Sequence, residues 1–160
     1  MIFVTVGTQG PFDRMIAAVD LWAKEQGRAD VFAQIGAGTP PEHIEWVRDL
    51  SPGAFEARLE SAEAVVAHAG MGTILTALSL GKPVVVMPRK ASLGEHRNEH
   101  QTATTERFEA MGRVTAVWDG DAMGGALDSL ASAETGERLA AQASPELLKR
   151  LRGFLDREPG

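Results

Sequence analysis

Two glycines in the segment His68-Ala-Gly-Met-Gly-Thr73 lie where a protein chain can bind an anion. A short apolar run, residues 64–67, precedes this segment, which predicts a strand-to-helix turn. Gly70 and Gly72 let the backbone turn tightly and approach a ligand, and Thr73 is expected to cap the following helix. Such a turn directs backbone N–H groups and the positive end of a helix dipole at one point, which suits a phosphate. Glycines in such turns also serve packing alone, so the local chemistry leaves both interpretations open.

The elements that would position this turn alternate along the chain with short connections, which predicts an α/β fold with a parallel sheet. Apolar runs without alternation are typical of strands covered on both faces. Such strands are expected at residues 2–6, 31–35, 64–67, 84–87 and 114–117. Helices are expected at 12–26, between the glycine turn and residue 84, at 55–62, 96–111 and 122–132, and from Pro145 onward. The first of these is expected to end at Gly27 and has one apolar face, formed by Phe12, Met15, Ile16, Val19 and Trp22. Residues 36–53 show no clear period and receive no assignment.

The composition is typical of one globular domain spanning residues 1–160, since 44% of the residues are hydrophobic and 24% are charged. The sequence has no cysteine, which excludes disulfides, catalytic thiolates and cysteine–zinc sites. Its formal net charge of −6 argues against general nucleic-acid binding. The N-terminus lacks a basic region, so no signal peptide is expected. Polar residues interrupt the apolar stretch at 64–87, so no membrane span is expected there.

Three motifs in order along the chain resemble the UDP-sugar-binding signature of GT-B glycosyltransferases, specifically the C-terminal domain of glycosyltransferase family 28. They are the glycine turn described above, Gly81-Lys-Pro-Val-Val-Val-Met-Pro88, and Glu95-His-Arg-Asn-Glu-His-Gln101. The opening of the chain is also similar to small stand-alone members of that family, and the resemblance covers roughly residues 1–118. Those members are the soluble catalytic subunit of a two-part dolichol-linked N-acetylglucosamine transferase and bacterial relatives in exopolysaccharide assembly.

The resemblance implies a Rossmann-like sheet with helices on both faces, the donor-binding half of a GT-B fold, with its site at the carboxyl ends of the strands. Loops after several strands are expected to converge there, including Gly36 to Gly38. The implied substrate-binding residues are Gly7, Thr8, His68, Gly70, Met71, Gly72, Thr73, Thr76, Pro88, Arg89, His96, Asn98, His100 and Gln101.

Within this implied site, the pyrophosphate of a UDP-sugar is expected on the amides of the glycine turn, with His100 and Gln101 beside the sugar. His68 is assigned to the nucleotide pocket, the alternative being a core histidine satisfied by a backbone carbonyl. For Gln101, the alternative is a solvated residue on the first turns of a helix. His96 either contacts the donor or caps the helix region with Glu95.

Thr76 departs from the family pattern, in which a glutamate three residues after the Ser/Thr of the turn holds the ribose hydroxyls. A threonine makes one neutral hydrogen bond where a carboxylate makes two stronger, charge-assisted ones. Either Glu99 or Glu106 replaces that grip, or the nucleotide is bound more weakly. The weaker grip favours the alternative of a non-catalytic regulatory subunit.

Asp119-Gly-Asp121 resembles the Asp-x-Asp motif that holds a divalent metal in the other large glycosyltransferase fold. The triplet lies between a predicted strand and a predicted helix, where Asp121 is expected to be the N-cap and Gly120 a turn residue. The capping interpretation is preferred. GT-B enzymes generally use helix dipoles and side chains in place of a metal, so neither a metal nor another cofactor is expected.

The resemblance also implies a missing partner, because a complete GT-B enzyme needs a second domain for the acceptor. No catalytic base is assigned in this chain, and it is expected on a membrane-anchored partner that binds a lipid-linked saccharide. The chain would be cytoplasmic and recruited to the inner face of the membrane. A UDP-sugar 2-epimerase is a further alternative, although such enzymes need both domains.

Two basic segments raise hypotheses about the donor and the partner. Arg89, Lys90, His96 and Arg97 form either a solvated loop, a contact for the partner or anionic lipid, or a grip on the carboxylate of a uronic acid donor. The donor itself stays open among UDP-glucuronate, UDP-galactose, UDP-glucose and UDP-N-acetylglucosamine. The helix from Pro145 carries an apolar stripe, formed by Leu147, Leu148, Leu151, Phe154 and Leu155, which packs on the core or holds the partner.

Overall fold

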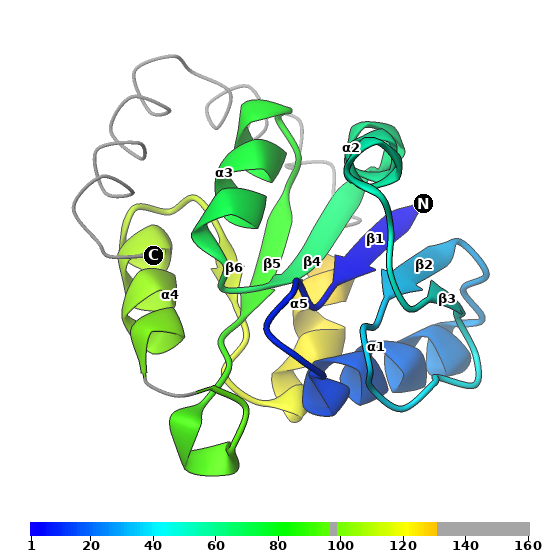
Figure 1. Ribbon diagram of the computed structural model, residues 1–160, viewed down its shortest axis with the longest axis horizontal. Helices are drawn as coiled ribbons and strands as arrows, with labels where there is room; N and C mark the ends of the chain where they lie inside the picture. Colours follow the sequence, from blue (N-terminus) through cyan, green and yellow to red (C-terminus); the bar gives the residue numbers. More distant parts are fainter. Residues whose placement is uncertain (97–98, 131–160) are drawn as a thin grey trace.

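The computed structural model describes residues 1–96 and 99–130, which form one sheet covered by helices (Figure 1). The strands are β1 (Ile2–Thr5), β2 (Val31–Gln34), β3 (Glu45–Val47), β4 (Ala64–His68), β5 (Val84–Met87) and β6 (Thr115–Ala116). The helices are α1 (Asp13–Gln26), α2 (Pro52–Ser61), α3 (Met71–Ser79), α4 (His100–Ala110) and α5 (Met123–Leu130), with 3-10 turns η1 (Ala91–Leu93) and η2 (Gly120–Ala122). The helix expected from Pro145, with its apolar stripe, lies outside the described residues. Within the described part, no helix has the length and apolar character needed to span a membrane.

All strand pairs in the sheet are parallel, and the strand order is β3-β2-β1-β4-β5-β6. The register places Val4 of β1 between Ala33 of β2 and Val66 of β4. From β1 the chain proceeds toward one edge of the sheet, and from β4 toward the other. The switch point therefore lies between β1 and β4, where loops at the carboxyl ends diverge and leave a crevice. The predicted parallel α/β fold is confirmed.

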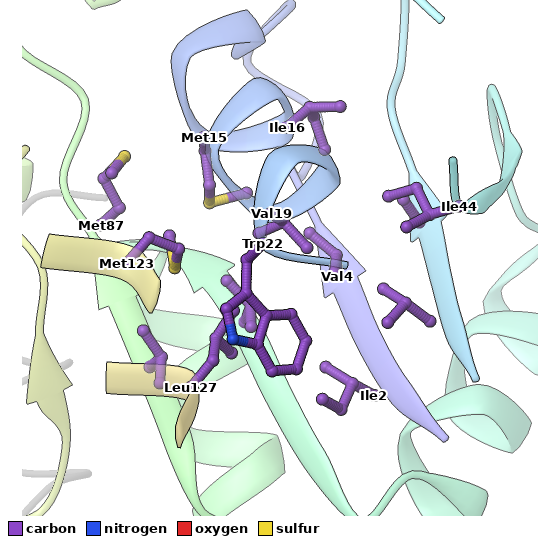
Figure 2. Packing of buried hydrophobic residues seen from close by; sticks show 14 of the residues in the cluster. Ile2, Val4, Met15, Ile16, Val19, Trp22, Ile44, Met87, Met123 and Leu127 are labelled. Carbon is purple, nitrogen blue, oxygen red and sulfur yellow. The ribbon is translucent and has the colours of Figure 1, made fainter. Parts of the chain in front are cut away.

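Helices α1 and α5 cover one face of the sheet, and α2, α3 and α4 cover the other (Figure 1). Figure 2 shows Trp22 of α1 among the buried apolar side chains of the first of these layers, which include Leu127 of α5. The predicted apolar face of α1 is buried, and the helix ends at Gly27 in the left-handed conformation, as expected. Phe3 on β1 points to the other layer, where it meets Phe32 and Phe55. Successive side chains of a strand thus fill two separate cores.

The segment 36–53, which received no assignment from the sequence, contains one strand and the start of one helix. Strand β3 pairs with β2 at the sheet edge, and its side chains are exposed or half-buried, so it lacks the apolar run of the inner strands. Helix α2 begins at Pro52, three residues earlier than expected. Ser51 caps it by accepting a hydrogen bond from the Ala54 backbone N–H at 3.2 Å, and Pro52 occupies the first turn.

One further helix start and two helix caps were predicted wrongly. Helix α4 begins at His100 rather than residue 96, so His96 lies in the preceding loop. Asp119, not Asp121, caps the turn before α5, because its carboxylate accepts from the backbone N–H groups of Asp121 and Ala122 at 3.0 and 3.3 Å. Thr73 lies inside the first turn of α3 and does not cap it.

Candidate functional site

A pocket of about 1100 Å³ opens at the carboxyl ends of the central strands, on the side of α2, α3 and α4. Its walls are the loop after β1, the first turns of α2 and α3, and the start of α4. Of the predicted site residues, the structure brings together Gly7, Thr8, His68, Gly70, Met71, Gly72, Thr73, Thr76, His96, His100 and Gln101. Asn98 lies outside the described residues. The loop at Gly36 to Gly38 does not line the pocket, although it was expected there.

The N-terminus of α3 faces this pocket and has no side-chain cap. Gly70 is the N-cap in an extended conformation, with φ −82° and ψ 122°. The amide of Ile74 bonds to the Gly70 carbonyl, so the amides before it begin the helix without an intrahelical acceptor. Neither Gly70 nor Gly72 has a positive φ, so the backbone conformation of the turn does not itself require glycine. The helix terminus nevertheless offers backbone donors and a positive dipole end to an anion.

His68 ends β4 beneath this turn and is 6% exposed. A Cβ atom added at Gly7 or at Gly70 would collide with the imidazole, so both backbones lie directly against the ring. Burial lowers the pKa of His68 to about 4, and the charges of Arg89 and His96 act in the same direction. The imidazole is therefore neutral at physiological pH. Its side-chain partner is Gln101, rather than the backbone carbonyl of the core-histidine alternative.

Gln101 is buried in the first turn of α4 and joins the ends of two strands. Its Oε1 accepts from the backbone N–H of Ala69 after β4 at 3.3 Å and of Arg89 after β5 at 3.0 Å. Its Nε2 lies 3.3 Å from Nδ1 of His68. The solvated alternative for Gln101 is therefore wrong. Because both oxygen lone pairs are used, this amide has only one remaining N–H for a sugar hydroxyl.

The loop after β1 is held by a polar network that begins at Thr5. Thr5 Oγ1 donates to Gln34 Oε1 at 2.7 Å and accepts from the backbone N–H of Gly7 at 3.2 Å. Gln34 Nε2 donates to the carbonyls of Arg48 at 3.0 Å and Gly7 at 3.4 Å. Gly7 has a φ of 72°, which favours glycine, and its missing side chain leaves room for His68. Gln34 also lines the pocket, although it was not predicted to do so.

Pro88 and Arg89 were predicted to bind the substrate, but both are buried and neither lines the pocket. The Arg89 guanidinium donates to the carbonyls of Val6 at 2.6 Å, Gly10 at 2.7 Å and Pro11 at 2.8 Å, and lies 4.9 Å from the centre of the Phe12 ring. The guanidinium thus holds the loop after β1 in place through its backbone carbonyls. Burial lowers the pKa of Arg89, and the charge of Glu95 opposes this effect. These contacts remove Arg89 from the proposed uronate grip.

Neither Glu99 nor Glu106, the two residues considered as replacements for the glutamate that holds the ribose in the family, lines the pocket. Glu99 accepts hydrogen bonds from the Ala91 backbone N–H at 2.9 Å and the Thr102 hydroxyl at 3.0 Å, and Glu106 is exposed elsewhere on α4. Thr76 does line the pocket, and its hydroxyl donates to the Gly72 carbonyl at 2.8 Å. The carboxylates that line the described pocket are Asp49 and Glu56, and no described lining residue is Lys or Arg.

The wall formed by α2 was missed entirely by the sequence prediction. Its lining residues are Asp49, Leu50, Pro52, Gly53, Phe55 and Glu56, and Gln9, Ala69 and Thr104 line other parts of the pocket. The Ser51-Pro52 pair was the available signal, since a serine followed by a proline is typical of the N-cap and first position of a helix. Within the described ranges, no group of three or more His, Cys, Asp or Glu side chains is placed to hold a metal ion.

Comparisons with known proteins agree with this geometry. Residues 1–151 match the glycosyltransferase family 28 C-terminal domain. The UDP-N-acetylglucosamine transferase subunit ALG13 of Eremothecium gossypii is 42% identical over 80 residues, which cover 46% of this chain and 37% of that protein. The match thus spans little more than a third of that relative.

Two solved structures have the same fold as this chain at low sequence identity. The glycotransferase of kitacinnamycin superposes with a TM-score of 0.66 at 20% identity, over 94% of this chain and 39% of that one. The UDP-GlcNAc 2-epimerase of Neisseria meningitidis, solved bound to UDP-GlcNAc, gives a TM-score of 0.60 at 16% identity, over 98% and 44% of the two chains. The chain spans less than half of either protein, and such likenesses report on fold alone.

Proposed function

The chain belongs to the glycosyltransferase family 28 C-terminal domain family and has the fold of one half of a GT-B glycosyltransferase, and on that premise we propose that it binds a UDP-sugar donor. It serves as the donor-binding subunit of a heteromeric, inverting glycosyltransferase. The partner is a membrane-anchored, acceptor-binding subunit, and the acceptor is a polyprenyl-diphosphate-linked saccharide of exopolysaccharide biosynthesis. No metal or other cofactor is required.

The observation that carries this proposal is the uncapped N-terminus of α3 at the floor of the pocket, beside the buried His68. The amides of the first helical turn and the helix dipole together favour a diphosphate. No described lining residue is Lys or Arg, so within the described pocket these backbone donors are the main attraction for an anion. The size of the pocket suits a nucleotide with an attached sugar, since ligand pockets commonly measure roughly 300–1,000 Å³.

The partner is proposed on two grounds, the name of a relative and the chemistry of transfer. The named relative is a subunit of a UDP-N-acetylglucosamine transferase. A general base must deprotonate the acceptor hydroxyl. The histidine–carboxylate pair of His43 and Asp20 lies outside the pocket, so it does not fill that role. We assign the base to the partner, which would also recruit this chain to the inner face of the cytoplasmic membrane.

Two alternatives are separated from this proposal by specific observations. A non-catalytic regulatory subunit is favoured by Thr76, which gives the ribose no carboxylate. A UDP-sugar 2-epimerase shares the fold, but the chain spans 44% of the solved one. Epimerase activity of this chain alone on UDP-N-acetylglucosamine would establish that alternative.

Isothermal titration with UDP tests the proposal, first with this chain alone and then together with the proposed membrane-anchored partner subunit. We expect saturable binding of UDP, and transfer of sugar from the bound donor only when the partner is present. Absence of binding in both titrations would favour the regulatory subunit. Competition among UDP-glucose, UDP-galactose, UDP-glucuronate and UDP-N-acetylglucosamine identifies the donor, and equal affinities would contradict a uronate-specific site.

A further inference from the structure

The orientation of the Gln101 side-chain amide is fixed by chemistry. Two backbone N–H groups, those of Ala69 and Arg89, point at the same side-chain atom of Gln101, at 3.3 and 3.0 Å. Only an oxygen can accept both bonds, so that atom is Oε1. The remaining amide atom, 3.3 Å from Nδ1 of His68, is therefore the NH2 group, which donates.

This donor decides which nitrogen of His68 carries the proton. A neutral imidazole has one N–H and one lone pair. Because the Gln101 amide donates to Nδ1, that nitrogen must supply the lone pair, and the proton must be on Nε2. Burial at 6% exposure beside the Arg89 cation favours the neutral ring.

The Nε2 side of the ring lies against the two loops that form the floor of the pocket. A Cβ atom added at Gly70 would lie 2.7 Å from Nε2, and one at Gly7 would collide with it. Among the described residues, no hydrogen bond engages Nε2. The nitrogen that carries the proton is thus placed between the loop after β1 and the N-terminus of α3, without a partner from the described chain.

We propose that Gln101 is a positioning residue that holds His68 in its Nε2–H form, so that the imidazole adds an N–H donor to the amides at the N-terminus of α3. This inference rests on the proposed function, because the group that accepts the bond is the diphosphate of the donor. It also gives Gln101 a role distinct from contact with sugar hydroxyls, since its oxygen is fully occupied by the backbone.

Nitrogen-15 NMR of histidine-labelled protein without ligand tests the tautomer directly. His68 is expected to show a protonated Nε2 and an unprotonated Nδ1. His43 provides an internal contrast, because its Nδ1 lies 3.1 Å from the Asp20 carboxylate, which can only accept, and so carries a proton. A protonated Nδ1 at His68 in the wild-type protein would overturn the proposal.

Gln101→Glu is the matched perturbation, because one carboxylate oxygen can still accept from the Ala69 and Arg89 amides. The other oxygen cannot donate to His68, so a proton should appear on Nδ1, while the His43 signals stay unchanged. Under mildly alkaline conditions, where a second ring proton is disfavoured, UDP affinity should fall roughly 10- to 100-fold, as expected for a lost bond to a charged group. Uridine, which has no phosphate, should bind equally well to both proteins.

The two measurements separate the inference from the proposed function. If the wild-type tautomer is as expected but UDP does not bind, the proposed function fails and the positioning by Gln101 stands. If Gln101→Glu moves the proton and UDP affinity is unchanged, His68 is not a donor to the diphosphate. Should that variant fail to fold, Gln101→Met takes its place, and a mixture of both tautomers is then expected.

Discussion

Replacing Arg89 with methionine should destabilise the protein and loosen the loop that forms one wall of the pocket. The guanidinium is fully buried and donates to the carbonyls of Val6, Gly10 and Pro11, which lie some 80 residues away in sequence. Methionine resembles the arginine stem in volume but has no donor. The carbonyl of Val6, the most deeply buried of the three, would lose its bond from the guanidinium.

The expected loss in the free energy of unfolding is about 2–5 kcal/mol. A buried acceptor left unsatisfied costs about 1–3 kcal/mol, and the cation over the Phe12 ring, 4.9 Å from its centre, contributes about 1–2 kcal/mol. The carbonyls of Gly10 and Pro11 belong to part-buried bonds, so water can replace much of what they lose. The relief of guanidinium desolvation places the loss toward the lower end of this range, because that burial already disfavours the charge and lowers the pKa of Arg89.

Urea denaturation of the wild type, Arg89→Met and Lys90→Met measures this loss. Lys90→Met is the matched control, since it removes the same charge from the next residue, whose side chain is half-buried. This variant should change the free energy of unfolding by less than about 0.5 kcal/mol. Arg89→Met should also weaken UDP binding, because Gly7, Thr8 and Gln9 line the pocket. If Arg89→Met is as stable as Lys90→Met, the buried guanidinium does not hold this loop.

Three further predictions concern the helix terminus, the histidine and the cap. Gly72→Val should fold normally, because an added Cβ meets nothing within 4 Å, but it should weaken UDP binding at least about tenfold by crowding the diphosphate. The control Gly125→Val, which is equally open but lies outside the pocket, should bind UDP like wild type. Equal UDP affinities of the two variants would place the diphosphate elsewhere. As the pH falls from 6.5 to about 4, the unfolded chain takes up a proton at His68 that the folded chain does not. The free energy of unfolding measured in urea titrations should therefore decrease by up to about 3 kcal/mol over this range. The variant His68→Asn should not show this dependence of stability on pH. Asp119→Ala should cost about 1 kcal/mol in the same assay and Asp121→Ala close to nothing, and the reverse order would show that Asp121 is the cap after all.

The features of this protein that follow local rules could be predicted from its amino-acid sequence. Unbroken apolar runs at 64–67 and 84–87 predicted inner strands of a parallel sheet, and Gly27 predicted the end of α1. These predictions are confirmed because periodicity and backbone sterics act within a few residues. The order of the three motifs also indicated the family, which the match over residues 1–151 shows.

The roles of the polar side chains in the site depend on contacts that form only when the chain folds. Arg89 reads in the sequence as part of an exposed basic loop, yet it is buried by carbonyls from the start of the chain. Gln101 reads as a surface residue of a helix, yet it joins β4, β5 and His68. Strand β3 forms by pairing with the edge of β2, a contact that its own sequence does not indicate. In each case the partners are distant in sequence, and no local pattern records which hydrogen-bonding groups the fold will bring within 3 Å or so of one another.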